Sequence, residues 1–431
     1  MTSVALAKKL YNSIRNLPAV AIAPGFTFAE LVADRPFVTP VELWQSNARL
    51  VRALRASGLP ESEILGNASD FEKLVAWLGA LRGTVGSTLA ADIFSDLSAL
   101  GVEDKNMLKN APVAWRMVCE TLARGGVTPR TLLSGKAALI KVEVTEPTPV
   151  GPLGETAYPL LCLDAIFSIE NADFAQRVAA ISQKTGISVV DLPTFEKALS
   201  ALLHSCAKIG APAVMLDLSG FDRFERPDPY HAGLSFARGL AGEGDAMSPR
   251  EIAIFRAQLL RTLGLIMKEI GMRFLLRVRP KTEHVKGDFS VKAFEKLLSY
   301  LQERRALVPT VLSLSAGEIP RGLALLLGRF RNADGTPLLL FGIEGEGATS
   351  AELSRSLRFY LKHGAASLLL GLTDSDQGCF SAPTRSRFVA ALSGELARYA
   401  RADGAGLFEA EDLLAVGRAI YQTQAAQFFG V

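Results

Sequence analysis

The chain has 431 residues and a formal net charge of +3, with 49% hydrophobic and 21% charged residues. This composition is that of a folded globular protein and excludes disorder over most of the chain. The near-neutral charge argues against a nucleic-acid-binding protein, which needs an excess of Lys and Arg. No apolar run approaches the ~18 residues that a membrane span requires, so no membrane partner is expected.

The cysteine and histidine content narrows the class of protein further. The four cysteines form no C-x-x-C pair, so neither a zinc cage nor a disulfide framework is indicated. The N-terminal residues lack the apolar core of a signal peptide. We therefore expect a cytoplasmic protein. The four histidines are also scattered, and none precedes His204.

The first third of the chain is predicted to be helical. Apolar residues recur at helical spacing in residues 41–57, 70–82 and 112–124. Residues 67–70 supply N-cap residue types before the second of these helices. Pro112 suits the first turn of the third, where its missing N–H does no harm.

From about residue 137, short apolar runs alternate with helix-length amphipathic stretches. The runs, each suited to a buried strand, are residues 138–144, 187–192, 213–218, 273–278, 310–314, 338–343 and 367–371. The predicted helices between or after them are residues 173–185, 195–209, 249–270, 291–305, 320–331, 350–363 and 386–401. Residues 146–154 and 226–244 are rich in Gly and Pro and are predicted to be loops.

These elements predict the fold class and the domain organisation. Together with residues 19–23 the strands number eight, and repeated strand-then-helix order implies a parallel sheet. We therefore predict an α/β protein, a (β/α)8 TIM-like barrel with an α-helical insertion after the first strand. Residues 1–30 would hold the first barrel strand, residues 31–135 the insertion, and residues 136–431 the remaining barrel and C-terminal helices.

Several segments, in order along the chain, resemble the uronate isomerase (glucuronate isomerase) family of the amidohydrolase superfamily. They include RPFVTPVELW (residues 35–44), LRASGL (54–59), ASDFEKLVAW (68–77), LPTF (192–195), LTDS (372–375) and the tail that ends near Phe429. The resemblance implies a distorted (β/α)8 barrel with a helical insertion. It also implies the reversible aldose–ketose isomerisation of hexuronates, with a divalent metal such as zinc.

The residues that this chemistry requires in the family are replaced. The family's H-x-H at the end of the first strand corresponds to Ala23-Pro24-Gly25, which offers no donor side chain. A strand-end histidine of the family is replaced by Arg277. We therefore predict that no cofactor is bound through the usual histidine ligands, and that the metal-dependent isomerase activity is lost or altered.

Four residues are the candidates for a site. Asp374 follows a predicted strand and survives from a family motif, so it is the candidate catalytic residue, although Asp also commonly caps a turn. Arg52, Arg277 and Arg279 are the candidates for substrate binding, because a guanidinium binds a carboxylate through two parallel hydrogen bonds. Arg277 and Arg279 are two residues apart on one strand and share a face, so ion pairs with strand-end acids are an equal alternative.

Two further patterns have structural explanations beside functional ones. Lys141 and Glu143 share a face of one predicted strand and are expected to pair with residues on adjacent strands, with a functional role as the alternative. The segment GIEGEG (residues 342–347) is predicted to be a loop rather than a phosphate site, because its two glutamates would repel an anion.

Three hypotheses on function remain open. The first is a divergent family member that keeps a pocket for a sugar acid or another polyhydroxy carboxylate. The second is a working isomerase whose site was rebuilt from strand-end acids, around a hard metal such as Mg²⁺ or Ca²⁺. The third is a non-catalytic pseudoenzyme that acts as a binding or regulatory subunit. In each case we expect a homo-oligomer.

Overall fold

The computed structural model contains one eight-stranded sheet whose strands lie in chain order, from β1 to β8. It describes residues 2–22, 26–84, 87–100, 110–133, 137–144, 146, 157–279, 288–374, 382–402 and 408–431. The strands are β1 (Ala21–Ile22), β2 (Ala138–Glu143), β3 (Ala157–Cys162), β4 (Ala213–Asp217), β5 (Arg273–Val278), β6 (Thr310–Ser315), β7 (Leu339–Glu344) and β8 (Leu369–Asp374). The pairs that β1 makes with β2 and that β3 to β6 make in succession are parallel. Parallel strands in chain order with helices between them are the (β/α)8 architecture, so the predicted fold class is confirmed.

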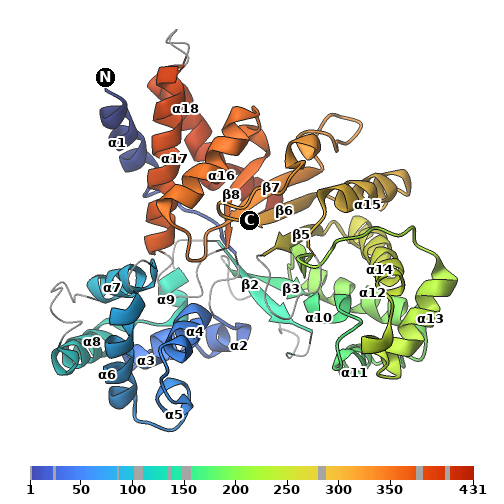
Figure 1. Cartoon of the computed structure of the whole chain (residues 1–431), viewed down its shortest axis with the longest axis horizontal. Helices are drawn as coiled ribbons and strands as arrows, with labels where there is room; N and C mark the ends of the chain where they lie inside the picture. Colours follow the sequence, from blue (N-terminus) through green and yellow to red (C-terminus); the bar gives the residue numbers. More distant parts are fainter. Residues whose placement is uncertain are drawn as a thin grey trace. The chain divides into compact units, whose positions relative to one another are not determined.

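A run of helices separates β1 from β2, as the sequence predicts (Figure 1). It comprises α2 (Phe28–Ala33), α3 (Pro40–Trp44), α4 (Ala48–Ala56), α5 (Glu61–Ile64), α6 (Asp70–Leu81), α7 (Leu89–Ala99), α8 (Ala111–Gly125) and α9 (Pro129–Leu133). Two segments of this insertion that carry the family resemblance build its core. Trp44 and Trp77 are each 1% exposed, and their indole N–H groups donate to Asp96 Oδ2 (3.2 Å) and the Glu63 carbonyl (2.8 Å). Burial of such large side chains with satisfied N–H groups stabilises a helical cluster that has no sheet of its own.

The helices between β3 and β6 enclose a cluster of phenylalanines. They are α10 (Asp164–Phe167), α11 (Phe174–Thr185), α12 (Leu192–Lys208), α13 (Pro229–Leu240), α14 (Pro249–Ile270) and α15 (Val291–Glu303). Phe174 lies edge-on to both Phe236 and Phe255, with ring centroids 5.8 Å apart in each pair. Phe195 stacks on Phe236 at 4.9 Å. Each buried ring contributes roughly 1.5–3 kcal/mol, so this cluster fixes α11 to α14 against one another.

The last helices of the chain are α16 (Ser350–Lys362), α17 (Ala382–Ala402), α18 (Ala410–Arg418) and α19 (Gln424–Phe429). Two of them pack against the first helix, α1 (Ser3–Ile14). Helix α1 contacts α17 and α18, and the Tyr11 and Ser386 hydroxyl oxygens are 2.8 Å apart. Among the described helices, none combines the length and the apolar composition needed to cross a bilayer.

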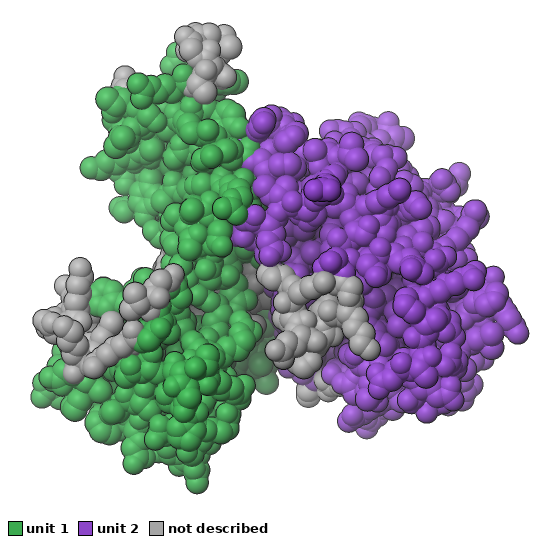
Figure 2. All heavy atoms as spheres, in the orientation of Figure 1, with its two compact units in different colours: residues 1–140, 343–358, 372–423 green, residues 141–342, 359–371, 424–431 purple. Residues whose placement is uncertain are grey.

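The chain divides into two compact units, coloured separately in Figure 2. Unit 1 consists of residues 1–140, 343–358 and 372–423, and unit 2 of residues 141–342, 359–371 and 424–431. Each unit is therefore built from segments far apart in the sequence. The three-part division proposed from the sequence stays a prediction.

The sequence misplaced one strand. Residues 187–192 are not a strand: Val190 is 71% exposed, and Asp191 caps α12 by accepting from the Thr194 N–H at 2.9 Å. The strand at this position in the sheet is β3, Ala157–Cys162. Its Pro159 has no N–H to donate to a sheet. Because a proline argues against a strand, the sequence did not predict one over these residues.

Two helix predictions and one loop prediction were also wrong in detail. Residues 320–331 form only a 3₁₀ turn, Leu323–Leu326, because Gly322 and Gly328 adopt left-handed φ values of 87° and 70°. Residues 226–244 are not a loop throughout, since α13 begins after the N-cap Asp228. The helix predicted over residues 41–57 is divided into α3 and α4, because Asn47 caps the second. In the predicted loop 146–154, residues 147–154 lie outside the described ones.

Candidate functional site

Polar side chains gather at the carboxyl ends of β2, β3, β4 and β5, all within unit 2. This edge of a parallel barrel is where (β/α)8 enzymes place their sites. At the end of β5, Arg277 lies level with Asp217 of β4 and Ser313 of β6 in the sheet register. Arg277 is only 4% exposed, and its Nη1 is 3.8 Å from Met215 Sδ. The sheet thus holds a guanidinium in the interior at this strand end.

Arg279 lies just beyond β5 and is tied to the end of β4. Its backbone N–H donates to Ser219 Oγ at 2.8 Å, and its Nε is 4.0 Å from Asp217 Oδ2. The Asp217 carboxylate also accepts hydrogen bonds from the Ser219 N–H (2.8 Å) and hydroxyl. The ion pair that the sequence offered as the alternative for Arg279 is therefore present, at a long distance of 4.0 Å. It does not exclude binding of a second anion, because a guanidinium has five N–H donors.

Three charged residues lie next to this cluster: Lys141 and Glu143 on β2, and Asp164 at the start of α10, just after β3. Lys141 and Glu143 form an ion pair with each other, within β2, where the sequence predicted partners on adjacent strands. Asp164 begins α10, and its Oδ1 accepts from the Asp217 N–H at 2.7 Å. Burial and the neighbouring Asp217 charge raise the pKa of Asp164. Burial alone would lower the pKa of Lys141, but the Cys162 thiol and Glu143 outweigh it and the pKa is raised.

The other two predicted site residues belong to unit 1. Arg52 lies on α4 with its side chain 68% exposed, and its Nη2 is 3.8 Å from Glu346 Oε1. Asp374 is the last residue of β8, at a strand end as predicted, and its side chain lies outside the described part. The structure therefore groups Arg277 with Arg279 in one unit. A pocket that combines them with Arg52 and Asp374 stays a prediction.

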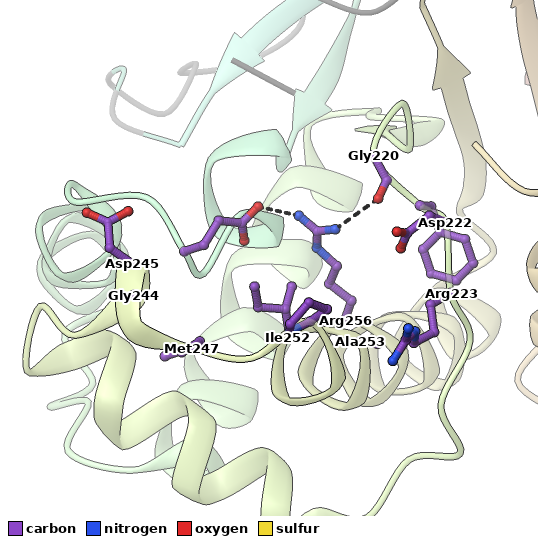
Figure 3. A pocket seen from close by; sticks show the side chains of 12 residues that line it. Gly220, Asp222, Arg223, Gly244, Asp245, Met247, Ile252, Ala253 and Arg256 are labelled. Carbon is purple, nitrogen blue, oxygen red and sulfur yellow. Dashed lines mark hydrogen bonds and ion pairs between the residues drawn. The ribbon is translucent and has the colours of Figure 1, made fainter. Parts of the chain in front are cut away.

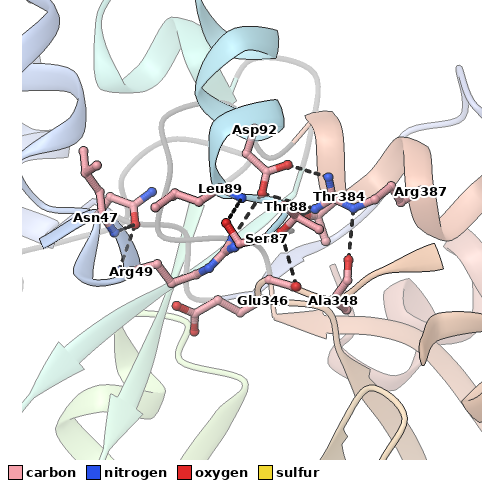
Figure 4. Close-up of polar contacts among 12 residues, drawn as sticks. Asn47, Arg49, Ser87, Thr88, Leu89, Asp92, Glu346, Ala348, Thr384 and Arg387 are labelled. Carbon is pink, nitrogen blue, oxygen red and sulfur yellow. Dashed lines mark hydrogen bonds and ion pairs between the residues drawn. The ribbon is translucent and has the colours of Figure 1, made fainter. Parts of the chain in front are cut away.

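The sequence reasoning missed a buried ion-pair network in unit 1 (Figure 4). Asp92 on α7 accepts from Arg49 Nη1 of α4 at 3.1 Å and from both terminal nitrogens of Arg387 of α17. The side chains of Asp92, Arg49 and Arg387 are 12%, 15% and 17% exposed. Arg49 also donates to Thr88 Oγ1 at 2.8 Å. A mostly buried carboxylate between two guanidinium groups is a strong electrostatic restraint.

This network holds the loop that follows β7. The sequence predicted a loop over residues 342–347, but residues 342–344 are the end of β7, so the loop begins at Gly345. Thr88 Oγ1 donates to the Gly347 carbonyl at 3.2 Å, and Arg387 Nε donates to the Ala348 carbonyl at 3.1 Å. Gly347 has φ +71°, and a Cβ there would lie 2.9 Å from Arg49 Cζ. The positive φ agrees with the predicted role of the glycine, and the close packing against Arg49 is a second reason for a residue without Cβ.

The divalent metal implied by the family resemblance was tested against the donors present. Within the described residues, no group of three or more His, Cys, Asp or Glu side chains is placed to hold a metal ion. Arg277 supplies a positive charge and no lone pair at a strand end where the family has a histidine. Residues 23–25, which replace the H-x-H, lie outside the described ones. The described donor set does not fit a histidine-ligated metal, and the expected absence of a cofactor stays a prediction.

Comparison with known proteins gives the same family as the motifs. The sequence model of the family described as Glucuronate isomerase matches residues 1–286. The uronate isomerase of Bacillus licheniformis is 25% identical over 286 residues, which are 63% of this chain and 59% of that protein. That of Caldicellulosiruptor saccharolyticus is 22% identical over 357 residues, 76% and 75% of the two chains. The alignment thus spans less than two thirds of the Bacillus relative and about three quarters of the second.

Solved structures agree on the fold. The uronate isomerase of Thermotoga maritima has a TM-score of 0.83 at 16% identity, with 99% of this chain and 97% of that chain covered. The glucuronate isomerase of Caulobacter crescentus has a TM-score of 0.82 at 16% identity, with 100% and 94% covered. Sequence identity this low to the solved structures establishes the architecture only. The family is established by the sequence model, which matches well more than half of the chain: this chain belongs to the glucuronate isomerase family.

Proposed function

We propose that this protein binds a hexuronate, or a closely related sugar acid, at the guanidinium-lined carboxyl ends of β4 and β5, and that it has lost the metal-dependent isomerisation of its family. The observation that supports this most directly is Arg277. It is a buried cation at a strand end, beside Asp217 in the sheet register. Burying a charge costs free energy unless an opposite charge lies close to it. The buried Arg277 guanidinium therefore requires negatively charged groups around it.

The surrounding residues favour a carboxylate ligand with hydroxyl groups. Arg277 and Arg279 supply N–H donors in the planar geometry that matches a carboxylate. Asp217, Glu143 and Asp164 supply acceptors for sugar hydroxyl groups. Hexuronates carry both kinds of group on one small molecule. The relatives named uronate isomerase supply the sugar-acid class by descent.

The same residues argue against the family reaction. Aldose–ketose isomerisation requires a base over the C–H bond and an electrophile for the developing enediolate. In metal-dependent isomerases a metal supplies the electrophile. Here Arg277 and Arg279 bring positive charge without metal ligation. Asp374 is the candidate base for any turnover that remains.

The test measures metal, turnover and binding on the same purified protein. We expect no stoichiometric zinc or manganese, and no conversion of glucuronate to fructuronate after either metal is added. Calorimetry should show saturable glucuronate binding that Arg277→Gln weakens about tenfold, since a charge-assisted bond is lost. Arg279→Gln, at a half-exposed position, should weaken it less. The control Arg238→Gln removes a guanidinium of similar exposure in the same unit, 32% against 38% for Arg279, and should leave glucuronate binding unchanged.

Each other outcome decides against the proposal. Stoichiometric metal with turnover that Asp374→Asn abolishes would establish a rebuilt enzyme. A folded protein that does not bind glucuronate would favour the regulatory-subunit hypothesis. The homo-oligomer is likewise a proposal, which light scattering on the purified protein would test.

A further inference from the structure

A buried arginine is normally held by acceptors of the protein itself. Arg256, on the wall of a pocket of about 240 Å³ in unit 2, is an example (Figure 3). It donates to Glu170 Oε1 at 2.5 Å, to the Phe167 carbonyl at 3.2 Å and to the Gly220 carbonyl at 3.4 Å. Arg256 therefore needs no ligand to complete its hydrogen bonds.

Arg385, near the start of α17 in unit 1, lacks such partners. Its side chain is half-buried, and no described residue forms an ion pair or a hydrogen bond with it. Burial lowers the pKa of its guanidinium, and the nearby Tyr421 hydroxyl opposes this. Removing a cation from water without an opposite charge costs free energy. An anion bound at Arg385 would reduce that cost.

The neighbouring sequence explains why Arg385 has no acidic partner. Residues 1–29, which include α1, contain three Lys or Arg residues and no Asp or Glu. Glu395 is the single acid in the sequence of α17, and it accepts hydrogen bonds from Arg358 and Arg398. Helices α1 and α17 together therefore carry an excess of positive charge, which favours an anionic ligand.

The Tyr421 hydroxyl is a second donor beside Arg385. Tyr421 is 7% exposed, and its ring stacks on that of Phe388 in α17 with centroids 6.5 Å apart. Burial and the neighbouring Tyr11 raise the pKa of Tyr421 whereas Arg385 lowers it, so the hydroxyl lies near both residues and is protonated at neutral pH. Tyr421 belongs to the π-helical turn Ala419–Thr423, between α18 and α19. Such turns are rare and are frequent at functional sites.

A pair of hydroxyl groups supplies a third donor. Tyr11 of α1 and Ser386, the residue after Arg385 in α17, have their hydroxyl oxygens 2.8 Å apart. One hydroxyl donates to the other, so the acceptor of this bond keeps its own proton for a further partner.

These donors are accessible to a ligand. The described atoms that are both inaccessible and without a hydrogen-bond partner include neither an Arg385 nitrogen nor the Tyr421 hydroxyl oxygen. Ser386 is exposed and Tyr11 is half-buried. Each donor therefore keeps surface that a ligand can reach from solvent.

We propose that Arg385, Tyr421 and the Tyr11–Ser386 pair bind a phosphate group, free or carried by a small molecule. The donors come from α1, which contacts α17 and α18, from α17 itself, and from the π-helical turn that continues α18 (Figure 1). A tetrahedral phosphate presents oxygens in several directions and accepts from donors on different elements, whereas a planar carboxylate has only two oxygens. The site belongs to unit 1 and shares no residue with the proposed hexuronate site of unit 2.

Calorimetric titration of the full-length protein tests the proposal with three probes: inorganic phosphate, glucose 6-phosphate and acetate. All are compared at one ionic strength, because salt screens exposed charges. We expect saturable binding of both phosphate probes and about tenfold weaker binding of acetate. Equal affinities for the two phosphate probes identify free phosphate as the ligand, and tighter binding of glucose 6-phosphate identifies a phosphate ester.

Two variants locate the binding. Arg385→Gln should weaken phosphate binding about tenfold, because a hydrogen bond to a charged group is lost. It should leave glucuronate binding unchanged and should not lower Tm, since no described residue bonds to this arginine. Tyr421→Phe keeps the ring against Phe388 and removes only the hydroxyl, so it should weaken phosphate binding about threefold. The control Arg398→Gln removes a guanidinium of the same helix that is paired with Glu395, and should leave phosphate binding unchanged.

Defined results overturn the proposal. Wild-type protein that binds no phosphate refutes it, as does phosphate binding that survives both Arg385→Gln and Tyr421→Phe. An equal loss of binding in Arg398→Gln would show that phosphate responds to the general positive charge of the helices and not to this site. Equal affinity for acetate and phosphate would refute the preference for a tetrahedral anion.

Discussion

Replacing Asp92 by Asn tests whether the buried network of unit 1 stabilises the fold. The variant keeps the size of the side chain but removes the negative charge between Arg49 and Arg387. It also turns one acceptor oxygen into an N–H donor that faces a guanidinium. A hydrogen bond to a charged group contributes about 1.5–3 kcal/mol, and removing one partner of a buried pair costs about 3–5 kcal/mol. Because Asn retains one acceptor, we expect a loss of about 3 kcal/mol.

That free energy converts into a measurable shift in melting temperature. Unfolding entropy is about 2.1 cal/mol/K per residue, which for the 431 residues gives about 0.9 kcal/mol/K. The expected decrease in Tm is therefore about 3 °C if the chain unfolds as one unit, and more if unit 1 melts separately. Differential scanning calorimetry at fixed protein concentration and scan rate measures it.

The matched control is Glu61→Gln, in the same unit. Glu61 pairs with Arg55 at 2.7 Å, but their side chains are 57% and 53% exposed. The substitution makes the same change in charge at a solvated pair, where ion pairs contribute little. A Tm for Asp92→Asn that falls no further than that of Glu61→Gln would refute the stabilising role of the network.

Three further predictions concern single residues. Gly347→Ala should destabilise the protein more than Gly58→Ala, because both have positive φ but only at Gly347 would the Cβ meet another group, Arg49; equal unfolding midpoints in urea would contradict this packing argument. Asp164 has a raised pKa, so its contribution to stability is present at low pH and is lost as the pH rises from the ordinary Asp value through the raised one. Asp164→Asn should therefore gain Tm relative to wild type on going from about pH 4 to pH 7, and a constant difference would contradict the shift. Burial raises the pKa of the Cys162 thiol well above its usual range, so peptide mass spectrometry after iodoacetamide treatment of native protein should find the half-buried Cys119 alkylated before Cys162.

The fold was predictable where local pattern and burial agree. Residues 273–278 were predicted as a strand and form β5 with the same bounds, and residues 249–270 form α14. Both segments have an unbroken apolar pattern with clear ends. The prediction failed where one residue contradicts the structure of its segment, as Pro159 does inside the strand β3. It failed also where a glycine with left-handed φ interrupts a predicted helix, as at Gly322.

The site was predictable to the level of strand ends but not of partners. Arg277 and Arg279 were singled out because strand ends carry chemistry in barrels, and Arg279 does contact Asp217 there. The Asp92 network was missed because Arg49 lies 43 residues and Arg387 lies 295 residues away in the chain. No periodicity connects residues at such separations, and only the folded chain brings their charges together.

Because 295 residues separate Asp92 from Arg387, the ribosome adds the two residues at different times. At about 5–20 residues per second, Arg387 is added roughly 15–60 s after Asp92. During that interval α7 and α4 are already made, and Asp92 has Arg49 as its partner, while α1 waits for α17 to be translated. Unit 2 is largely synthesised meanwhile. Until then the first helices of unit 1 lack the contacts that α17 provides, so unit 1 is complete only near the end of synthesis.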